Sequence, residues 1–351
     1  MSWVRSLARP DILALEPYAH AAWEPGLARL HANELPWRTP GDDSQDGLNR
    51  YPEPQPRTLI ERLAALYRSP PETLLVTRGS DEAIDLLTRA FCRAGEDAIL
   101  VCPPTFGMYA AAARIQGARV VGVPLMADRG FALDADAVLR ACTSDVKLVF
   151  LCSPNNPTGN LLDATAIREI ADALAGRALV VLDQAYIEFA ADAAAGAPPR
   201  PAPNLAILRT LSKAHGLAGA RIGTLIADAE VIALARKVIA PYAITQQTLE
   251  LVLRLLWPPH LAQMRRRIGE ILAERERLRE ALARAPQTIR VLPSEANFFL
   301  VRLEDPALAL ERARSAGLLV RDVRGFPGLS DALRVSVGTP EQNERLLEAW
   351  Q

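Results

Sequence analysis

The sequence lacks a strong net charge and any long apolar run. Lys and Arg together number 40 and Asp and Glu 41, which gives a formal charge of −1. So small a charge creates no global field that would attract nucleic acid or an acidic membrane surface, and any anion must be bound locally. No stretch approaches the roughly 20 apolar residues that a membrane-spanning helix needs. We therefore expect neither a nucleic-acid nor a membrane partner.

The sequence also lacks clustered cysteines and a signal peptide. Cys92, Cys102, Cys142 and Cys152 lie far apart, with no CxxC pair and no zinc-ligand spacing. We interpret them as buried free thiols of a reducing compartment and expect no metal site. The N-terminal MSWVRSLARPDILALEPYAH has neither the apolar core nor the small-residue cleavage site of a signal peptide. These features predict a cytoplasmic protein.

The middle of the chain alternates between strand-like and helix-like segments. Short apolar, β-branched runs recur, namely LLVT, AILVC, RVVGVPL, VKLVFLCS, ALVVLD, LAILRT and IGTLIA. Segments with helical spacing, such as 80–95 and 163–176, separate most of them. This alternation predicts an α/β fold with a mostly parallel sheet covered by helices on both faces. The Pro/Ala-rich stretch 193–203 is interpreted as a surface loop between two strands.

From about residue 246 the pattern changes. Residues 261–285 have the spacing of a long amphipathic helix, and their charged run is interpreted as a solvated face. Strand-like segments and a terminal helix follow, as in a small α+β domain. We predict three parts: an N-terminal arm that also contributes to the small domain (1–40), a large cofactor-binding domain (41–245) and a small C-terminal domain (246–351).

Three of the predicted strands end in polar residues. Asn156 lies in the PNNPTG that follows one strand, Asp183 ends the next with Tyr186 close behind, and Lys213 follows a third. Each alone has an ordinary structural explanation as a turn, a cap or a solvated side chain. In a parallel sheet, however, the three strand ends share one edge, where ligands bind. An amide, a carboxylate, a phenol and an amine would then meet in one crevice, with Arg221 nearby.

This combination of groups suits pyridoxal phosphate. A lysine forms the Schiff base, and an acid keeps the pyridinium nitrogen protonated so that the ring acts as an electron sink. A phenol and an amide can donate to the phenolic oxygen of the ring. Lys213, once displaced by substrate, is placed to move a proton.

The same cofactor needs a site for its phosphate. Gly79, Ser80 and Asp81 lie between a strand and a helix, where free N–H groups and the helix dipole bind anions. The segment equally fits a simple N-cap with acidic residues in the first turn. In CPPTFGMY, Phe106 or Tyr109 could stack on the ring, although either also suits ordinary packing. Further hydroxyl and guanidinium donors would come from Thr210, Ser212 and Arg221.

The motifs together resemble one enzyme family. NRYPEP, RGSDEAIDLLTRAF, CPPTFGMY, CSPNNPTG, LSKAHGLAGARIG, VIAPY, SEANFFLVR and LRVSVGTPEQN occur in the order found in histidinol-phosphate aminotransferases. These are fold-type I pyridoxal-phosphate enzymes, and the resemblance extends from about Leu15 to the C-terminus. It implies ping-pong transamination between histidinol phosphate and 2-oxoglutarate, giving imidazole acetol phosphate and glutamate, in histidine biosynthesis.

The resemblance also implies roles for individual residues. Lys213 resembles the Schiff-base lysine and Asp183 the partner of the pyridinium nitrogen. Asn156 and Tyr186 resemble the donors to the ring oxygen, and Tyr109 resembles the stacking aromatic. The residues that resemble the phosphate cup are Gly79, Ser80, Asp81, Thr210, Ser212 and Arg221.

Other residues resemble the substrate site and the contact with a second subunit. Tyr51 would reach the phosphate of the neighbouring subunit's cofactor, which implies a homodimer with shared active sites. Arg321 and Arg334, with Tyr18 and Asn156, resemble the groups that hold the substrate's phosphate or carboxylate. Two arginines suit that task because a planar guanidinium can bind either anion bidentately, although salt bridges at strand ends would explain them too.

The sequence departs from the family pattern at several positions. Gln184 replaces the usual glutamate beside Asp183, His215 replaces the aromatic after Ser-Lys-Ala, and His31 replaces an asparagine. A threonine-phosphate decarboxylase or an aromatic amino acid aminotransferase of the same fold is the alternative function. A non-catalytic cofactor-binding half of a transcription regulator is a third, which we do not expect because the resemblance begins near residue 15.

Overall fold

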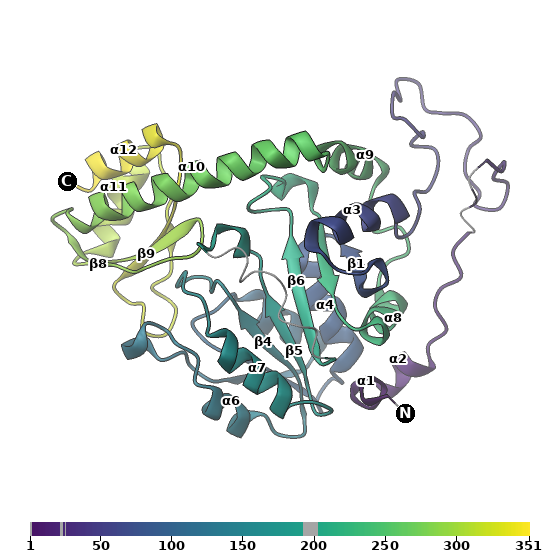
Figure 1. The fold of residues 1–351 in the computed structure, drawn as a ribbon, viewed down its shortest axis with the longest axis horizontal. Helices are drawn as coiled ribbons and strands as arrows, with labels where there is room; N and C mark the ends of the chain where they lie inside the picture. The colour runs from purple at the N-terminus through teal and green to yellow at the C-terminus, as the bar shows by residue number, and fades with distance from the viewer. Residues whose placement is uncertain (1, 22–23, 25, 192–202) are drawn as a thin grey trace.

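The computed structural model describes residues 2–21, 24, 26–191 and 203–351. The predicted loop at 193–203 lies, except for its last residue, outside these residues. At the centre is a seven-stranded sheet of order β1–β7–β6–β5–β4–β2–β3 (Figure 1). Only β7 runs antiparallel to its neighbours, so the expected mostly parallel sheet is confirmed. The strands are β1 (Leu74–Thr77), β2 (Ala98–Val101), β3 (Arg119–Gly122), β4 (Val146–Cys152), β5 (Leu179–Asp183), β6 (Leu205–Thr210) and β7 (Gly223–Ile226).

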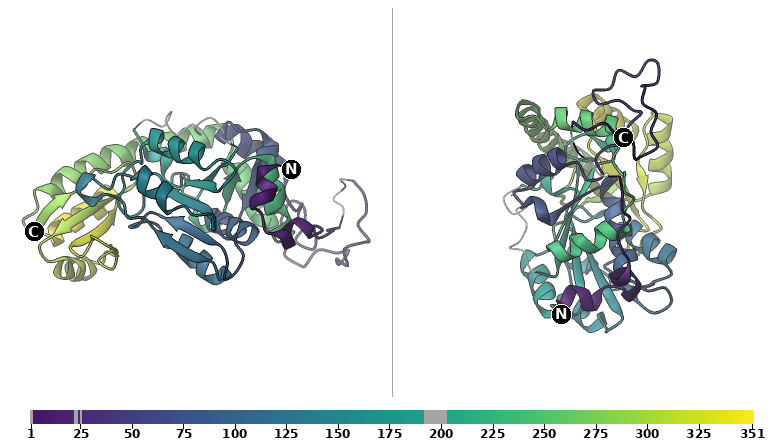
Figure 2. Two further views of the ribbon diagram at one scale, coloured as in Figure 1. Left: turned by 90° about the horizontal axis from the view of Figure 1, so that it is seen from below. Right: turned by 90° about the vertical axis from the view of Figure 1, so that its right-hand side faces the viewer.

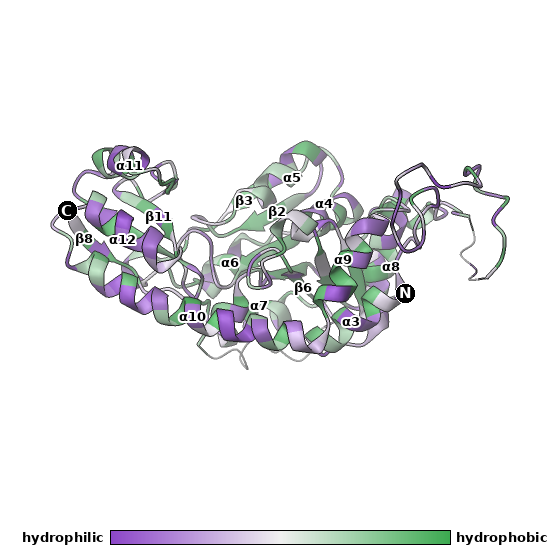
Figure 3. Ribbon diagram, turned by 90° about the horizontal axis from the view of Figure 1, so that it is seen from above, coloured by the Kyte–Doolittle hydropathy of each residue, from purple (hydrophilic) through white to green (hydrophobic). Residues whose placement is uncertain are grey.

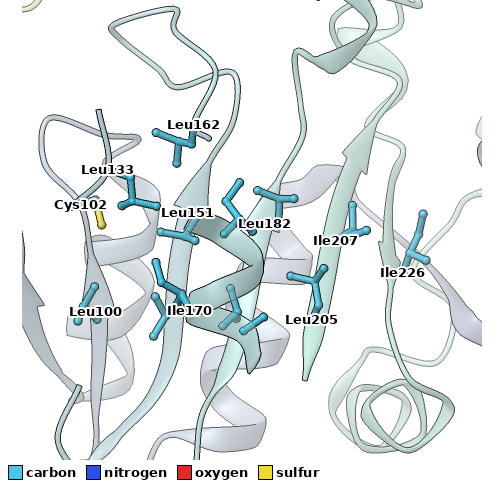
Figure 4. Packing of buried hydrophobic residues seen from close by; sticks show 14 of the residues in the cluster. Leu100, Cys102, Leu133, Leu151, Leu162, Ile170, Leu182, Leu205, Ile207 and Ile226 are labelled. Carbon is cyan, nitrogen blue, oxygen red and sulfur yellow. The ribbon is translucent and has the colours of Figure 1, made fainter. Parts of the chain in front are cut away.

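Helices cover both faces of this sheet because successive strand side chains point to opposite sides. Leu182 and Ile207 belong to the core on one face (Figure 4). Val181 and Leu208 belong to the core on the other face. Burying each such side chain contributes roughly 1.5–3 kcal/mol. The first core includes α3 (Arg57–Tyr67), α6 (Ala135–Ala141), α7 (Ala164–Ala173) and α9 (Gln246–Leu255), and the second includes α1 (Trp3–Leu7), α4 (Gly79–Phe91), α5 (Met108–Gln116) and α8 (Ala229–Val238).

A second, four-stranded antiparallel sheet of order β10–β11–β9–β8 lies at the far end of the molecule. The helix α10 (Pro258–Ala283) runs from α9 to this sheet, with polar and apolar bands alternating along it (Figures 1 and 3). Leu278 and Leu282 of α10 are buried with the indole of Trp350 in a separate core. The elements here are β8 (Thr288–Val291), β9 (Phe298–Leu303), α11 (Pro306–Ser315), β10 (Arg321–Asp322), β11 (Ala332–Ser336) and α12 (Pro340–Ala349).

The N-terminal region has much less regular secondary structure than the rest of the chain. α1 and α2 (Pro10–Ala14) contact α8 beside the large sheet. The described residues between α2 and α3 form no helix or strand and extend away from the body (Figures 1 and 2). They expose large apolar side chains, including Leu30 and Trp37. In the described residues, no helix is long and apolar enough to cross a membrane.

Candidate active site

The carboxyl ends of β4, β5 and β6 meet the N-terminus of α4 around one cavity. Because β4, β5 and β6 are parallel, residues far apart in sequence reach this edge together. The predicted residues that line the cavity are Ser80, Asp81, Asn156, Asp183, Tyr186, Thr210, Ser212, Lys213 and Arg221. In the described part of the chain, no cluster of three His, Cys, Asp or Glu side chains could hold a metal ion.

Asp183 provides a buried carboxylate at the floor of the cavity. It ends β5 and is 3% exposed. The Tyr109 hydroxyl donates to one carboxylate oxygen at 2.7 Å, and the Ala185 N–H donates to the other at 3.0 Å. Burial raises the pKa of Asp183 to about 6, although both hydrogen bonds oppose the shift. An ionised Asp183 therefore gains from any cation that enters the cavity above it.

Tyr109 is buried beside the cavity and is not among the residues that line it. It is fully buried in α5, its ring stacks on Phe150 with centroids 4.8 Å apart, and its hydroxyl is engaged by Asp183. Phe106, which precedes α5, lines the cavity and meets Tyr109 edge to face. Of the two aromatic residues in this segment, Phe106 therefore faces the cavity, because the first turn of α5 directs Tyr109 into the core.

Asn156 and Tyr186 form a polar wall that reaches the small sheet. The Asn156 amide donates to the Tyr186 hydroxyl at 3.4 Å, and Arg334 of β11 donates to the Asn156 side-chain oxygen. The ring of Tyr186 meets Phe298 of β9 edge to face. Burial raises the pKa of Tyr186, so this phenol stays protonated and can donate a hydrogen bond.

Lys213 follows β6 and presents its amine to the cavity. The residue is partly open to solvent, and its Nζ lies 5.5 Å from the centroid of the Tyr186 ring. Loss of solvent around the ammonium group lowers the pKa of Lys213, and the charge of Arg334 lowers it further. A lowered pKa increases the neutral, nucleophilic fraction of this amine.

The predicted phosphate cup forms where β7 approaches the start of α4. Gly79 has φ +75°, and a Cβ on Gly223 would lie 2.2 Å from the carbonyl carbon of Gly79, so both positions require glycine. Arg221 reaches Asp81 at 3.1 Å and the Ser212 hydroxyl at 3.4 Å. The hydroxyls of Ser212 and Thr210, 3.0 Å apart, complete a cradle of donors at a helix N-terminus.

The two predicted substrate arginines are brought together by the small sheet. Arg321 of β10 and Arg334 of β11 are directly paired across the antiparallel ladder, so their side chains share one face. No carboxylate pairs with either guanidinium among the residues that the structure describes, and the buried Nε of Arg334 has no hydrogen-bond partner. The pair is therefore a concentration of positive charge beside the cavity.

Two predicted residues lie outside this cavity. Tyr18 is 73% exposed, and Tyr51 is 48% exposed with its ring stacked on Tyr242 at 4.5 Å. Both belong to the segment that leaves the body before α3.

Some lining residues were not predicted. Cys152, Ala185 and Ala218 also line the cavity. Cys152 is the register partner of Asp183 across β4 and β5. Aligning the two predicted strand ends would have placed its thiol there.

Comparisons with known proteins agree on a single family. The model of the family described as aminotransferase class I and II matches residues 30–349. A histidinol-phosphate aminotransferase of Xanthomonas euvesicatoria is 49% identical, covering 100% of this chain and 97% of that protein. The solved histidinol-phosphate aminotransferase of Sinorhizobium meliloti in complex with pyridoxal-5'-phosphate has a TM-score of 0.76 at 25% identity, covering 86% and 82%. The L-threonine-O-3-phosphate decarboxylase of Porphyromonas gingivalis has a TM-score of 0.69 at 28% identity, covering 86% and 92%.

Proposed function

The chain belongs to the aminotransferase class I and II family, and from that premise we propose that it is a pyridoxal-phosphate-dependent histidinol-phosphate aminotransferase. It moves an amino group between histidinol phosphate and 2-oxoglutarate in two half-reactions, giving imidazole acetol phosphate and glutamate. The biosynthetic direction is the reverse. The full-length relatives of that name and the arginine pair support this assignment.

The residues at the sheet edge fit three chemically different parts of the cofactor. Asp183 would face the ring nitrogen, Lys213 the aldehyde carbon, and the cradle around Gly79 and Arg221 the phosphate. Phe106 would cover the ring, while Asn156 and Tyr186 would donate to its phenolic oxygen. Bound pyridoxal phosphate supplies an electron sink that stabilises negative charge at the substrate Cα.

Two residues would hold or transfer protons in the proposed reaction. Lys213, with its lowered pKa, would take the proton from the substrate Cα and carry it to the carbon that accepts it. Asp183 would keep the ring nitrogen protonated, because a buried carboxylate gains most from a cation directly beside it.

The observation that carries the substrate assignment is the cross-strand pair of Arg321 and Arg334. Histidinol phosphate carries a phosphate and no α-carboxylate, while glutamate carries two carboxylates. Two adjacent guanidinium forks, unpaired with any carboxylate in the described residues, can accept either anion. Arg334 also contacts Asn156, which links the anion site to the cavity that holds the reacting atoms.

An absorbance spectrum tests this proposal directly. Histidinol phosphate added without a keto acid should bleach the visible band of the bound cofactor, and 2-oxoglutarate should restore it. A visible band that histidinol phosphate leaves unchanged would reject the substrate while keeping the cofactor.

A phosphothreonine decarboxylase is the second candidate, because the Porphyromonas gingivalis structure shares the fold at 28% identity. Such an enzyme would release carbon dioxide from threonine phosphate and would need no 2-oxoglutarate. Aromatic amino acids form the third substrate class to be offered, since the arginine pair accepts carboxylates as well as phosphates. Release of carbon dioxide from threonine phosphate with the visible band retained would redirect the assignment to the decarboxylase, and loss of the band with phenylalanine would redirect it to the aromatic aminotransferase.

We also propose that the enzyme works as a homodimer. Tyr51 and the exposed apolar side chains of the segment before α3 would be covered by a second copy, and Tyr51 would donate to the phosphate held by that copy. Tyr18 would reach the substrate from the same segment. The cytoplasmic location remains a prediction.

A further inference from the structure

The backbone segments that supply the active site carry a second polar cluster on their other side. It borders a separate cavity between the large sheet and α10, lined by Glu188, Arg209 and His215. Every member lies within two positions of an active-site residue: Gln184 beside Asp183, Glu188 beside Tyr186, Arg209 beside Thr210 and His215 beside Lys213. The cluster therefore sits behind the same strand ends that form the catalytic edge.

Arg209 connects the members of this cluster. It is 9% exposed and donates to Glu188 Oε1 at 2.9 Å and to Gln184 Oε1 at 3.4 Å. Its guanidinium lies over the ring of Tyr67 in α3, 4.8 Å from the centroid. One side chain thus connects the end of β5, the 3-10 turn Ile187–Phe189 and α3 to the end of β6.

Within the described residues, Arg209 is the cation that hydrogen-bonds Glu188. His215 is 9% exposed with its Nδ1 unpartnered, and burial lowers its pKa, so it is neutral near pH 7. Tyr67 stays a neutral phenol because burial raises its pKa. Arg265 of α10 lines the same cavity and forms no ion pair with Glu188. Removing Arg209 would leave a largely buried negative charge uncompensated.

We propose that Arg209 and Glu188 are positioning residues, whose ion pair fixes the backbone that presents Asp183, Thr210 and Lys213 to the cofactor. The inference rests on the proposed function. The fixed backbone is continuous, because Gln184 N–H donates to the carbonyl of Leu208 at 3.0 Å, across the ends of β5 and β6. Misplacement of a reacting group by about 1 Å can reduce a rate by about a hundredfold.

Two variants separate positioning from simple stability. Arg209→Met leaves the Glu188 carboxylate without its cationic partner and should lower the melting temperature. The double variant Arg209→Met/Glu188→Met replaces the pair with apolar side chains of similar volume, which is often neutral or stabilising. We expect the double variant to recover the melting temperature of the wild type, while kcat stays reduced about tenfold or more and KM changes less than about twofold.

The visible spectrum of the bound cofactor gives a readout besides activity. In the double variant, the pH midpoint of the cofactor band should differ from that of the wild type, because Lys213 and Asp183 are displaced relative to the ring. A double variant with wild-type kcat and wild-type midpoint would overturn the proposal.

Arg93→Met is the matched control. Arg93 pairs with Asp97, whose side chain is 2% exposed, at the amino end of β2, opposite the active-site edge. Arg93→Met should lower the melting temperature without changing kcat or the band midpoint. If it changed kcat and the midpoint as much as the double variant does, the positioning role would be overturned. If histidinol phosphate leaves the wild-type band unchanged, the proposed function fails, yet the midpoints still test the positioning proposal with pyridoxal phosphate alone.

Discussion

The sheet edge and the N-terminal segment differ in how far one chain can complete a site. At the edge, side chains from β4, β5 and β6 meet in one cavity, and Asp183 is 3% exposed. In the N-terminal segment, Tyr18 and Tyr51 remain 73% and 48% exposed. Sheet topology brings the first group together by itself, whereas the second group lies outside the cavity of its own chain. Removing residues from each region tests this difference.

The largest effect should come from Lys213→Ala. Without its amine, the group assigned to move the Cα proton is lost, so kcat should fall by about 10³ or more. The visible cofactor band should disappear, while the cup around Arg221 still retains the cofactor weakly. Stopped-flow absorbance measures both. Lys147→Ala, a lysine near Asp97 at the other end of the strands, is the control and should keep wild-type turnover. Retained transamination in Lys213→Ala would end the proposed mechanism.

Asp183→Asn should have the next largest effect on turnover. The neutral amide cannot hold a proton on the ring nitrogen, so kcat should fall by about 10²-fold while KM changes little. Steady-state kinetics measure this loss. A variant with near wild-type kcat would show that Asp183 is structural, holding Tyr109 and the turn after β5.

The same carboxyl should give the cofactor-free protein a distinctive pH dependence. Its folded-state pKa of about 6 lies above the ordinary aspartate value of 3.8, so ionisation costs more in the folded state. The stability linked to this group is present below pH 3.8 and is lost as the pH rises through about 6, by about 2–3 kcal/mol. Urea unfolding at several pH values should register this loss in the wild type and its absence in Asp183→Asn. Added cofactor should reduce the loss.

Much of the active-site edge could be predicted from the sequence because strand ends are local features. Asp183 and Lys213 each follow an apolar run, and parallel pairing then places them together. The role of Tyr109 could not be predicted in this way, since the direction of a ring at the start of a helix depends on what packs around it. The ion pair between Glu188 and Arg209 was missed because nothing in the spacing shows which face of the edge a polar side chain occupies.

The arginine pair should have an intermediate effect. Arg334→Met removes charge-assisted hydrogen bonds to the substrate anion, so KM for histidinol phosphate should rise by about 10- to 100-fold. Arg321→Met should raise KM similarly, because the two guanidiniums are cross-strand partners. Kinetics with histidinol phosphate and with glutamate measure both losses. A variant that loses affinity for only one of the two anions would show that the arginines divide the substrates between them.

The smallest effect, and the one that addresses the N-terminal segment, should come from Tyr51→Phe. Loss of one hydrogen bond to the phosphate should weaken cofactor binding by about 3- to 10-fold, as measured by equilibrium dialysis. Mixing Tyr51→Phe with Lys213→Ala tests whether the residue acts across subunits. A hybrid dimer would contain one site with both substitutions and one with neither, so half of its sites should bind cofactor with wild-type affinity. If the hybrid contains no wild-type site, Tyr51 acts within its own chain and the contrast between the two regions disappears.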